Sequence, residues 1–279
     1  MIPPQFEYHR ASSLEEAIKI LSEDSNAKPL AGGQSLIPLL KLRAIAPSKL
    51  VDIGRLKELS YIRPEGEGLA IGALTTHWDL ERWAGPCGVL PEAARQIGDP
   101  QIRAMGTIGG SLAHADPAAD WPAVVLALGA VIEVKGPSGP REVSAEDFFQ
   151  GPYTTALQQG ELVVGIKIPR CPPRASYVKI ARAYNDFAIA GVAAALWVKD
   201  GVVEEARLAA TGVGLKPVRL KKAEESIRGR RATADVLAEV AEAASKEVEP
   251  ISDVRASAEY RRAMAGVAAR RAVRRALGL

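Results

Sequence analysis

Apolar residues follow a helical spacing near the start of the chain. Between residues 13 and 22 they recur every three or four positions, which predicts a helix with one face turned to a core. The residues on that face are Leu14, Ala17, Ile18 and Leu21. Ser13 and Glu16 have the spacing of a capping box, so we expect the helix to begin at this pair.

Short apolar runs and helical patterns then alternate as far as residue 168. The apolar runs predict strands over 28–31, 50–53, 61–63, 69–72, 131–135 and 162–168. Helical patterns occupy 36–42, 76–84, 89–97 and 121–128. Residues 106–120 have no clean period, so we expect a long loop there. Long loops inside a structured region are usually functional.

The pattern changes at Pro169–Pro173, where three prolines fall within five residues. Such a cluster marks a domain boundary, which gives the domains 1–173 and 174–279. Beyond the boundary, strands are expected over 176–181, 188–199 and 202–210, and helices over 233–246 and 256–277. Asp200-Gly201 is a hairpin turn signal. The chain is therefore expected to be α+β, with an antiparallel meander and helices in its second domain.

Composition sets limits on the class of protein. Of the 279 residues, 47% are hydrophobic and 25% are charged, so the chain can bury a sizeable core and is not a disordered or low-complexity protein. Its longest nearly apolar run, 188–198, is too short for a membrane helix, which needs about 20 residues. The N-terminus has no charged leader followed by an apolar stretch, which argues against a secretory signal and favours a cytoplasmic location.

The net charge of +3 comes from 36 basic and 33 acidic residues, a balance that argues against a nucleic-acid partner. The basic excess is local and lies near the C-terminus. It includes Arg270, Arg271, Arg274 and Arg275. This cluster fits a solvated helix face or a docking surface for an acidic partner.

Cys87 and Cys171 are the only cysteines in the sequence. Two cysteines do not make a disulfide framework, and no CxxC pair is present to hold zinc or an iron–sulfur cluster. Each is therefore expected to be a buried or idle thiol.

Two glycine-rich segments are the most informative chemical features. The first runs from Ala31 through Gly32, Gly33 and Gln34 to Ser35, and a helix expected from Leu36 would add its positive end. The second is Thr107-Ile108-Gly109-Gly110-Ser111. Paired glycines let consecutive backbone N–H groups approach a phosphate, and two such segments suit a dinucleotide diphosphate. Neither matches a Walker or GxGxxG motif, and tight turns of purely structural role remain an alternative.

Several polar residues near these segments are further candidates. Asp116 and Asp120 would accept hydrogen bonds from sugar or ribityl hydroxyls, or Asp120 would cap the following helix. His77 and His114 are isolated, so neither is expected to bind a metal, although His114 would suit a donor to a cofactor. Lys179 would stabilise negative charge on a flavin ring; the same residue would also fit an exposed strand position. Tyr184 leaves the same two alternatives, with stacking on the ring as its functional one.

Segments along essentially the whole chain resemble one family. The two long motifs are 31–43 and 102–120, and shorter matches are 71–76, 161–169, Lys179 with 186–190, and 259–262. With these motifs the chain resembles the FAD-binding medium subunit of molybdenum hydroxylases, a family that includes the carbon monoxide dehydrogenase medium subunit and the flavin domain of xanthine dehydrogenase.

The resemblance implies a fold and a set of cofactor contacts. It implies an FAD-binding α/β region of the PCMH type with two subdomains, split near residue 55, and a C-terminal domain with a three-stranded antiparallel sheet and helices. Backbone amides of 31–36 and 107–111 would hold the FAD diphosphate non-covalently. Asp120 would contact ribityl hydroxyls, Val163 would pack near the flavin or adenine, and Lys179 would lie near the ring. The implied cofactor-binding residues are Ala31, Gly32, Gly33, Gln34, Ser35, Leu36, Gly106, Thr107, Gly109, Gly110, Ser111, Ala113, His114, Asp116, Asp120, Val163 and Lys179.

The resemblance also implies an electron-transfer role within an oxidoreductase. The flavin would do the redox chemistry while the protein positions it. Electrons would come from a small 2Fe-2S subunit, and a large subunit would carry the molybdenum cofactor, in a dimer of heterotrimers. The substrate would be an aldehyde, carbon monoxide or a purine, and the acceptor NAD, a quinone or oxygen. No catalytic residue of this chain's own is implied.

The sequence departs from the family pattern at two positions. Gln34 stands where many members have His, and Ser111 where Asn is common; both keep hydrogen-bonding ability. The chain also lacks the cysteine-bearing insertion of members with an extra cluster. Two other functions fit the residues: a stand-alone FAD-dependent oxidoreductase with its own substrate pocket, and a nucleotide-binding regulatory module without redox activity.

Overall fold

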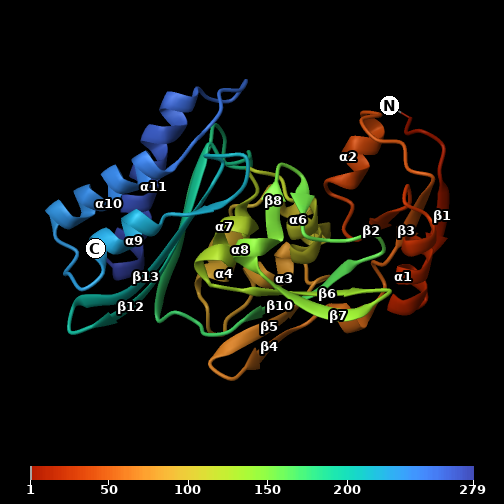
Figure 1. Ribbon diagram of the computed structural model, residues 1–279, viewed down its shortest axis with the longest axis horizontal. Helices are drawn as coiled ribbons and strands as arrows, with labels where there is room; N and C mark the ends of the chain where they lie inside the picture. Colours follow the sequence, from red (N-terminus) through yellow and green to blue (C-terminus); the bar gives the residue numbers. More distant parts are fainter. Residues whose placement is uncertain (1) are drawn as a thin grey trace.

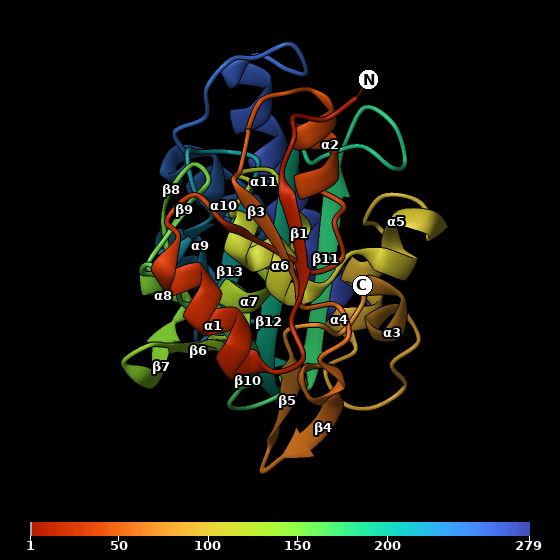
Figure 2. The same ribbon diagram turned by 90° about the vertical axis from the view of Figure 1, so that its right-hand side faces the viewer.

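The computed structural model describes residues 2–279, which fold into three packed units (Figure 1). The first unit is a parallel sheet in the order β1-β3-β2, formed by β1 (Glu7–Arg10), β2 (Lys28–Leu30) and β3 (Lys49–Asp52). Helices α1 (Leu14–Glu23) and α2 (Leu36–Lys41) connect its strands. Figure 2 looks onto this unit, with α1 beside β1 and β3.

Helix α1 begins as its sequence predicts. All four expected apolar residues are buried, and Ser13 Oγ accepts from the amide of Glu16. The capping box is only half formed, because the Glu16 carboxylate binds the amide and hydroxyl of Ser12 instead. This contact lowers the pKa of Glu16 to about 2.

The second unit is a five-stranded antiparallel sheet in the order β4-β5-β10-β6-β7. Its strands are β4 (Ile62–Glu65), β5 (Gly68–Gly72), β6 (Val131–Gly136), β7 (Gly139–Ser144) and β10 (Leu162–Ile168). The helices of this unit are α3 (His77–Glu81), α4 (Val89–Ala94), α5 (Pro100–Met105), α6 (Ile108–His114), α7 (Asp120–Ala127) and α8 (Ala145–Phe148). A 3-10 turn, η1 (Lys57–Leu59), precedes the sheet, and β8 (Phe149–Gly151) pairs with β9 (Thr154–Thr155).

The third unit is an antiparallel sheet whose strands follow one another in chain order. They are β11 (Arg174–Ile180), β12 (Ala190–Lys199), β13 (Val202–Thr211) and β14 (Val218–Arg219). Helices α9 (Lys221–Ile227), α10 (Ala234–Glu247) and α11 (Ala258–Leu277) cover its outer face (Figure 1). Three long strands were expected, and the two-residue β14 makes the fourth.

Strand β12 separates two hydrophobic cores. Alternate residues point to opposite faces of a strand. Ala193, Ala195 and Trp197 therefore join the core of the second unit. Val192 and Leu196 face the helices of the third unit. Helix α7, all of whose residues are buried, fills the space between the two sheets and contacts both β12 and β13.

Two expectations from the sequence are wrong. Residues 106–120 are not a long loop, because Ile108–His114 form α6. Thr107 Oγ1 caps this helix, and Ile108 and Leu112 bury one face of it. Cys87 and Cys171 are not idle thiols but form a disulfide across 84 residues. The fold brings them together because Cys87 lies two residues before α4, Cys171 lies three residues before β11, and α4 packs on β11.

No helix within residues 2–279 is both long enough and apolar enough to span a bilayer.

Candidate functional site: two glycine segments and a buried ion pair

The two glycine segments lie against each other. We call residues 31–36 the first glycine segment and residues 106–111 the second. A Cβ on Gly32 would collide with the backbone carbonyl of Met105, and a Cβ on Gly110 would lie 3.9 Å from Ala31 Cβ. Gly32 is therefore required by the close approach of the two backbones. The fold places side by side what the sequence separates by about 75 residues.

The first segment carries a run of free backbone donors. Among residues 2–279, no group accepts a hydrogen bond from the amides of residues 32–36. Gly33 has φ +73°, a left-handed conformation that suits glycine. Consecutive amides around such a residue form a concavity that binds anions. Because this segment is partly open to solvent, the run fits the diphosphate of a dinucleotide.

The second segment has fewer free donors than its sequence suggests. Ile108 and Gly109 donate their amides to Thr75 O and Ala73 O, Gly110 donates to Thr107 Oγ1, and Ser111 donates to Thr107 O. Within the described chain, only the amide of Thr107 in this capped turn has no acceptor. The second segment thus offers a small-residue surface and the hydroxyl of Ser111 rather than a second run of amides.

A buried histidine, His77, lies against Gly106 of the second segment. The amide of His77 donates to Gly106 O at 2.9 Å, and a Cβ on Gly106 would lie 2.8 Å from His77 Nε2. His77 Nδ1 accepts a hydrogen bond from Trp121 Nε1 at 3.0 Å, so this nitrogen carries no proton and the ring is neutral. Burial, helped by the charge of Arg103, lowers the pKa of His77 to about 4. The sequence shows His77 only as isolated; in the structure its buried ring lies against Gly106 and binds Trp121.

The residues after the second segment form a small polar group. His114 lies at the end of α6, and its ring is 5.2 Å from that of Tyr153, a partner that the sequence does not reveal. Burial lowers the pKa of His114. Asp116 Oδ1 accepts from the amide of Ala118 at 2.8 Å, and Tyr153 Oη lies 3.4 Å from Asp116 Oδ2.

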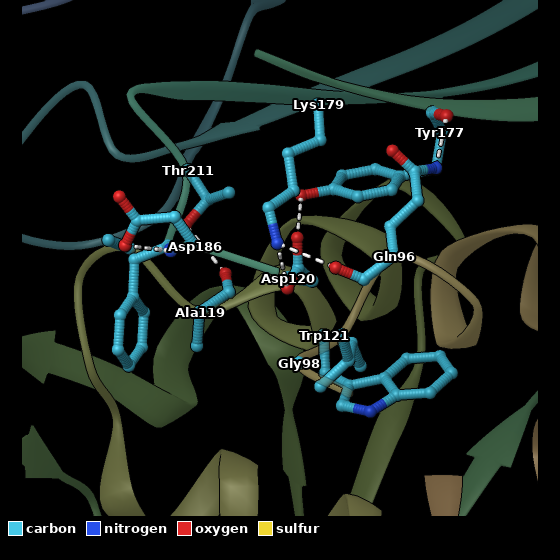
Figure 3. Close-up of polar contacts among 12 residues, drawn as sticks. Gln96, Gly98, Ala119, Asp120, Trp121, Tyr177, Lys179, Asp186 and Thr211 are labelled. Atoms are coloured by element: carbon cyan, nitrogen blue, oxygen red, sulfur yellow. Dashed lines mark hydrogen bonds and ion pairs between the residues drawn. The ribbon is translucent and has the colours of Figure 1, made fainter. Parts of the chain in front are cut away.

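Asp120 and Lys179 bind each other in the interior (Figure 3). Lys179 Nζ lies 3.1 Å from Asp120 Oδ2 and 2.8 Å from Gln96 O, and Tyr177 donates to Asp120 Oδ1 at 2.6 Å. Burial raises the pKa of Asp120, while Lys179 and Tyr177 act in the opposite direction. Burial also raises the pKa of Tyr177 well above its ordinary value. The cluster joins the segment after α4 and the start of α7, both in the second unit, to β11 of the third.

These positions exclude some of the alternatives drawn from the sequence. Asp120 does not cap a helix, since it is the first residue of α7 and Ala119 holds the cap position. Lys179 is not an exposed strand residue, because its side chain is 4% exposed. Tyr184 is 77% exposed, and Val163 is buried in the core of the second unit.

No cluster of three or more His, Cys, Asp or Glu side chains suited to a metal ion occurs in residues 2–279. A cavity of about 530 Å³ lies elsewhere, between α7, α8 and β13, with Arg207 and Arg219 among its lining residues. It includes no residue of either glycine segment.

Comparisons with known proteins match the whole chain. The family described as "FAD binding domain in molybdopterin dehydrogenase" matches residues 4–171, and "CO dehydrogenase flavoprotein C-terminal domain" matches residues 175–276. The glyceraldehyde dehydrogenase medium chain of Sulfolobus acidocaldarius is 44% identical over 94% of this chain and 95% of its own. The carbon monoxide dehydrogenase medium chain of Afipia carboxidovorans is 41% identical over 99% and 98%. A solved carbon monoxide dehydrogenase from Hydrogenophaga pseudoflava has a TM-score of 0.96 at 41% identity, covering 100% of this chain and 99% of that one.

Proposed function

The chain belongs to the family of FAD-binding medium subunits of molybdenum hydroxylases, and on that premise we propose that its two glycine segments hold the diphosphate of one non-covalent FAD. The observation that carries the proposal is the run of free amides over residues 32–36, which faces the small residues of the second segment. These amides supply the hydrogen bonds, and Ser111 supplies a hydroxyl at the rim.

The other candidate residues divide by accessibility. Gly106, Thr107 and Ala113 shape the second segment and α6, and His114 and Asp116 follow at a partly open position suited to sugar or ribityl hydroxyls. Asp120, Val163 and Lys179 are buried. We assign Asp120 and Lys179 to holding the segment before α7 in place, next to the flavin end of the site.

Bound FAD supplies the redox chemistry, accepting electrons and passing them to an acceptor. The chain's own residues bind and orient the cofactor. The named relatives are medium chains of glyceraldehyde and carbon monoxide dehydrogenases. We infer that this chain likewise assembles with a small 2Fe-2S subunit and a large molybdenum subunit, as a dimer of heterotrimers, and relays electrons between the iron–sulfur partner and an external acceptor.

The disulfide bears on the location of the chain in the cell, because a disulfide such as Cys87–Cys171 is rare in reducing compartments. We propose a cytoplasmic location with the disulfide protected by burial, since Cys87 is 3% exposed. Alkylation of thiols in acid-quenched cell lysates measures whether the disulfide is present in the cell. We expect both cysteines to resist alkylation. Labelling of both would show that the bond is absent in the cell.

The glycine assignment is tested by two matched substitutions. Gly33 and Gly66 both have positive φ, at +73° and +58°, but only Gly33 lies in the first segment; Gly66 sits in the β4–β5 turn with open space around it. Both replacements by alanine put a Cβ on a residue of positive φ, and at Gly33 that Cβ would also lie 3.1 Å from Ile37 Cγ1. We expect Gly33→Ala to lose most of its FAD absorbance at equal protein concentration and Gly66→Ala to keep it. Equal flavin content in the two variants would refute the assignment.

A further inference from the structure

Arg261, near the start of α11, is a buried cation at the centre of a group of backbone carbonyls. Its side chain is 5% exposed. Nη1 lies 2.9 Å from Ile189 O, 2.7 Å from Gly212 O and 3.5 Å from Ala188 O. Nη2 binds both carboxylate oxygens of Asp253 at 2.8 Å. The guanidinium therefore joins the segments before β12 and after β13 to the start of α11.

Those two segments hold the stretch that follows the second glycine segment. The amide of Gly212 donates to Pro117 O at 2.8 Å, and the amide of Ala188 donates to Ala118 O at 3.3 Å. Thr211 Oγ1 lies 2.7 Å from Ala119 O, the contact drawn in Figure 3, and 2.9 Å from Pro117 O. Three consecutive carbonyls, those of residues 117–119, thus bind groups of the third unit.

The convergence of these backbones needs hydrogen-bond donors between them. The carbonyl oxygens of Ala188, Ile189 and Gly212 all carry partial negative charge and point to one place, so they repel one another unless donors lie between them. Gly212 allows the approach, since it has φ +76° and a Cβ on it would lie 2.7 Å from Ala188 O. A planar guanidinium meets several acceptors at once, whereas a lysine ammonium is a compact point charge.

We propose that Arg261 is a positioning residue for the flavin site: through the 188–189 and 211–212 backbones it fixes residues 117–119, and with them Asp116 and the start of α7. This inference rests on the proposed function, because it assumes that FAD lies beside this stretch. It assigns to the C-terminal helix, far from the glycine segments in sequence, a part in cofactor affinity.

The test measures FAD binding by apoprotein variants of the full chain. We expect Arg261→Met to raise the dissociation constant for FAD at least tenfold and to alter the visible circular dichroism of the bound flavin. Arg261→Lys, which keeps the charge but not the planar donor set, should recover part of the affinity. Arg262→Met is the matched control, because Arg262 is the exposed neighbour on the same helix, and it should bind FAD like the wild type.

Thr211→Val extends the test to the case in which Arg261→Met does not fold. It removes the hydroxyl that holds Pro117 and Ala119 and leaves Arg261 untouched. A raised dissociation constant in Thr211→Val and Arg261→Lys supports the proposal. Wild-type affinity and an unchanged flavin spectrum in both, even with lower thermal stability, would overturn it. Failure of the wild type itself to bind FAD would refute the proposed function instead.

Discussion

Lys179 on β11 and Asp120 at the start of α7 form an ion pair between two units of the fold, with side chains only 4% and 6% exposed. The pair stands 59 residues apart in the sequence. It links the strand that opens the third unit to the helix that follows the proposed flavin-binding stretch. The contact thus couples the second unit to the third where the proposed flavin-binding stretch ends.

Removing one partner of this pair should cost more than removing both. Lys179→Met leaves the Asp120 carboxylate buried without its cation, and such a loss typically lowers the free energy of unfolding by about 3–5 kcal/mol. The double variant Lys179→Met/Asp120→Asn removes both charges and should recover part of that loss. Urea denaturation of the wild type, the two single variants Lys179→Met and Asp120→Asn, and the double variant measures the coupling. Additive losses would show that the two side chains do not interact.

Protonation of His77 should destabilise the fold in mild acid. Its pKa is about 4 in the folded chain and 6.5 ordinarily, so the unfolded chain binds the proton more tightly. Stability from neutral His77 is complete above pH 6.5 and is lost as the pH falls towards 4, by about 3 kcal/mol if the whole shift is realised. His77→Gln, which keeps an acceptor for Trp121, should lack this component. Unfolding curves of both proteins at pH 7 and pH 4.5 measure this component. The same loss of unfolding free energy in the wild type and in His77→Gln would contradict the buried neutral ring.

Substitutions at the adjacent residues Gly109 and Gly110 should have different effects, one on stability and the other on FAD binding. A Cβ on Gly109 would lie 2.5 Å from Ala73 Cβ and 2.7 Å from Ala73 O, so Gly109→Ala should lower thermal stability. Gly110 faces the first segment, and the nearest atom to its Cβ is Thr107 Oγ1 at 2.8 Å. We expect Gly110→Val to lose FAD with a smaller change in the melting temperature of the apoprotein. The reverse order of effects would show that Gly109, not Gly110, faces the cofactor.

Reduction of the disulfide should lower stability without unfolding the FAD region. Cys87 and Cys171 close a loop across 84 residues, for which chain entropy predicts about 4.6 kcal/mol. The melting temperature of the wild type should therefore fall on addition of a thiol reductant. Cys87→Ser should melt at the reduced temperature with or without reductant. An unchanged melting temperature of the wild type on addition of the reductant would show that the disulfide is absent.

The sequence predicted those elements whose apolar pattern is continuous. Strand β10 has the predicted bounds, 162–168, because its apolar run is buried on both faces. Strand β1 was missed because it is an exposed edge strand with the sequence Glu-Tyr-His-Arg, which carries no apolar signal. Helix α6 was missed because paired glycines are poor helix formers, and here tertiary burial of Ile108 and Leu112 outweighs that propensity.

The candidate site likewise has features that local sequence predicts and features that it does not. The glycine segments could be recognised from local sequence, because the conformational freedom of glycine is a local property. The commitment of the second segment's amides, the pairing of Lys179 with Asp120 and the position of His77 under Gly106 depend on residues far apart in the chain. Sequence patterns carry no information about such pairs. The domain limits at residues 55 and 173 stay predictions.

A crystal structure of the chain grown with FAD tests the central claim most directly. The account predicts the cofactor's diphosphate within hydrogen-bonding distance of several amides of residues 32–36, with the second glycine segment beside it. A well-ordered FAD whose diphosphate lies away from these amides, or a first segment left empty at saturating FAD, would contradict it.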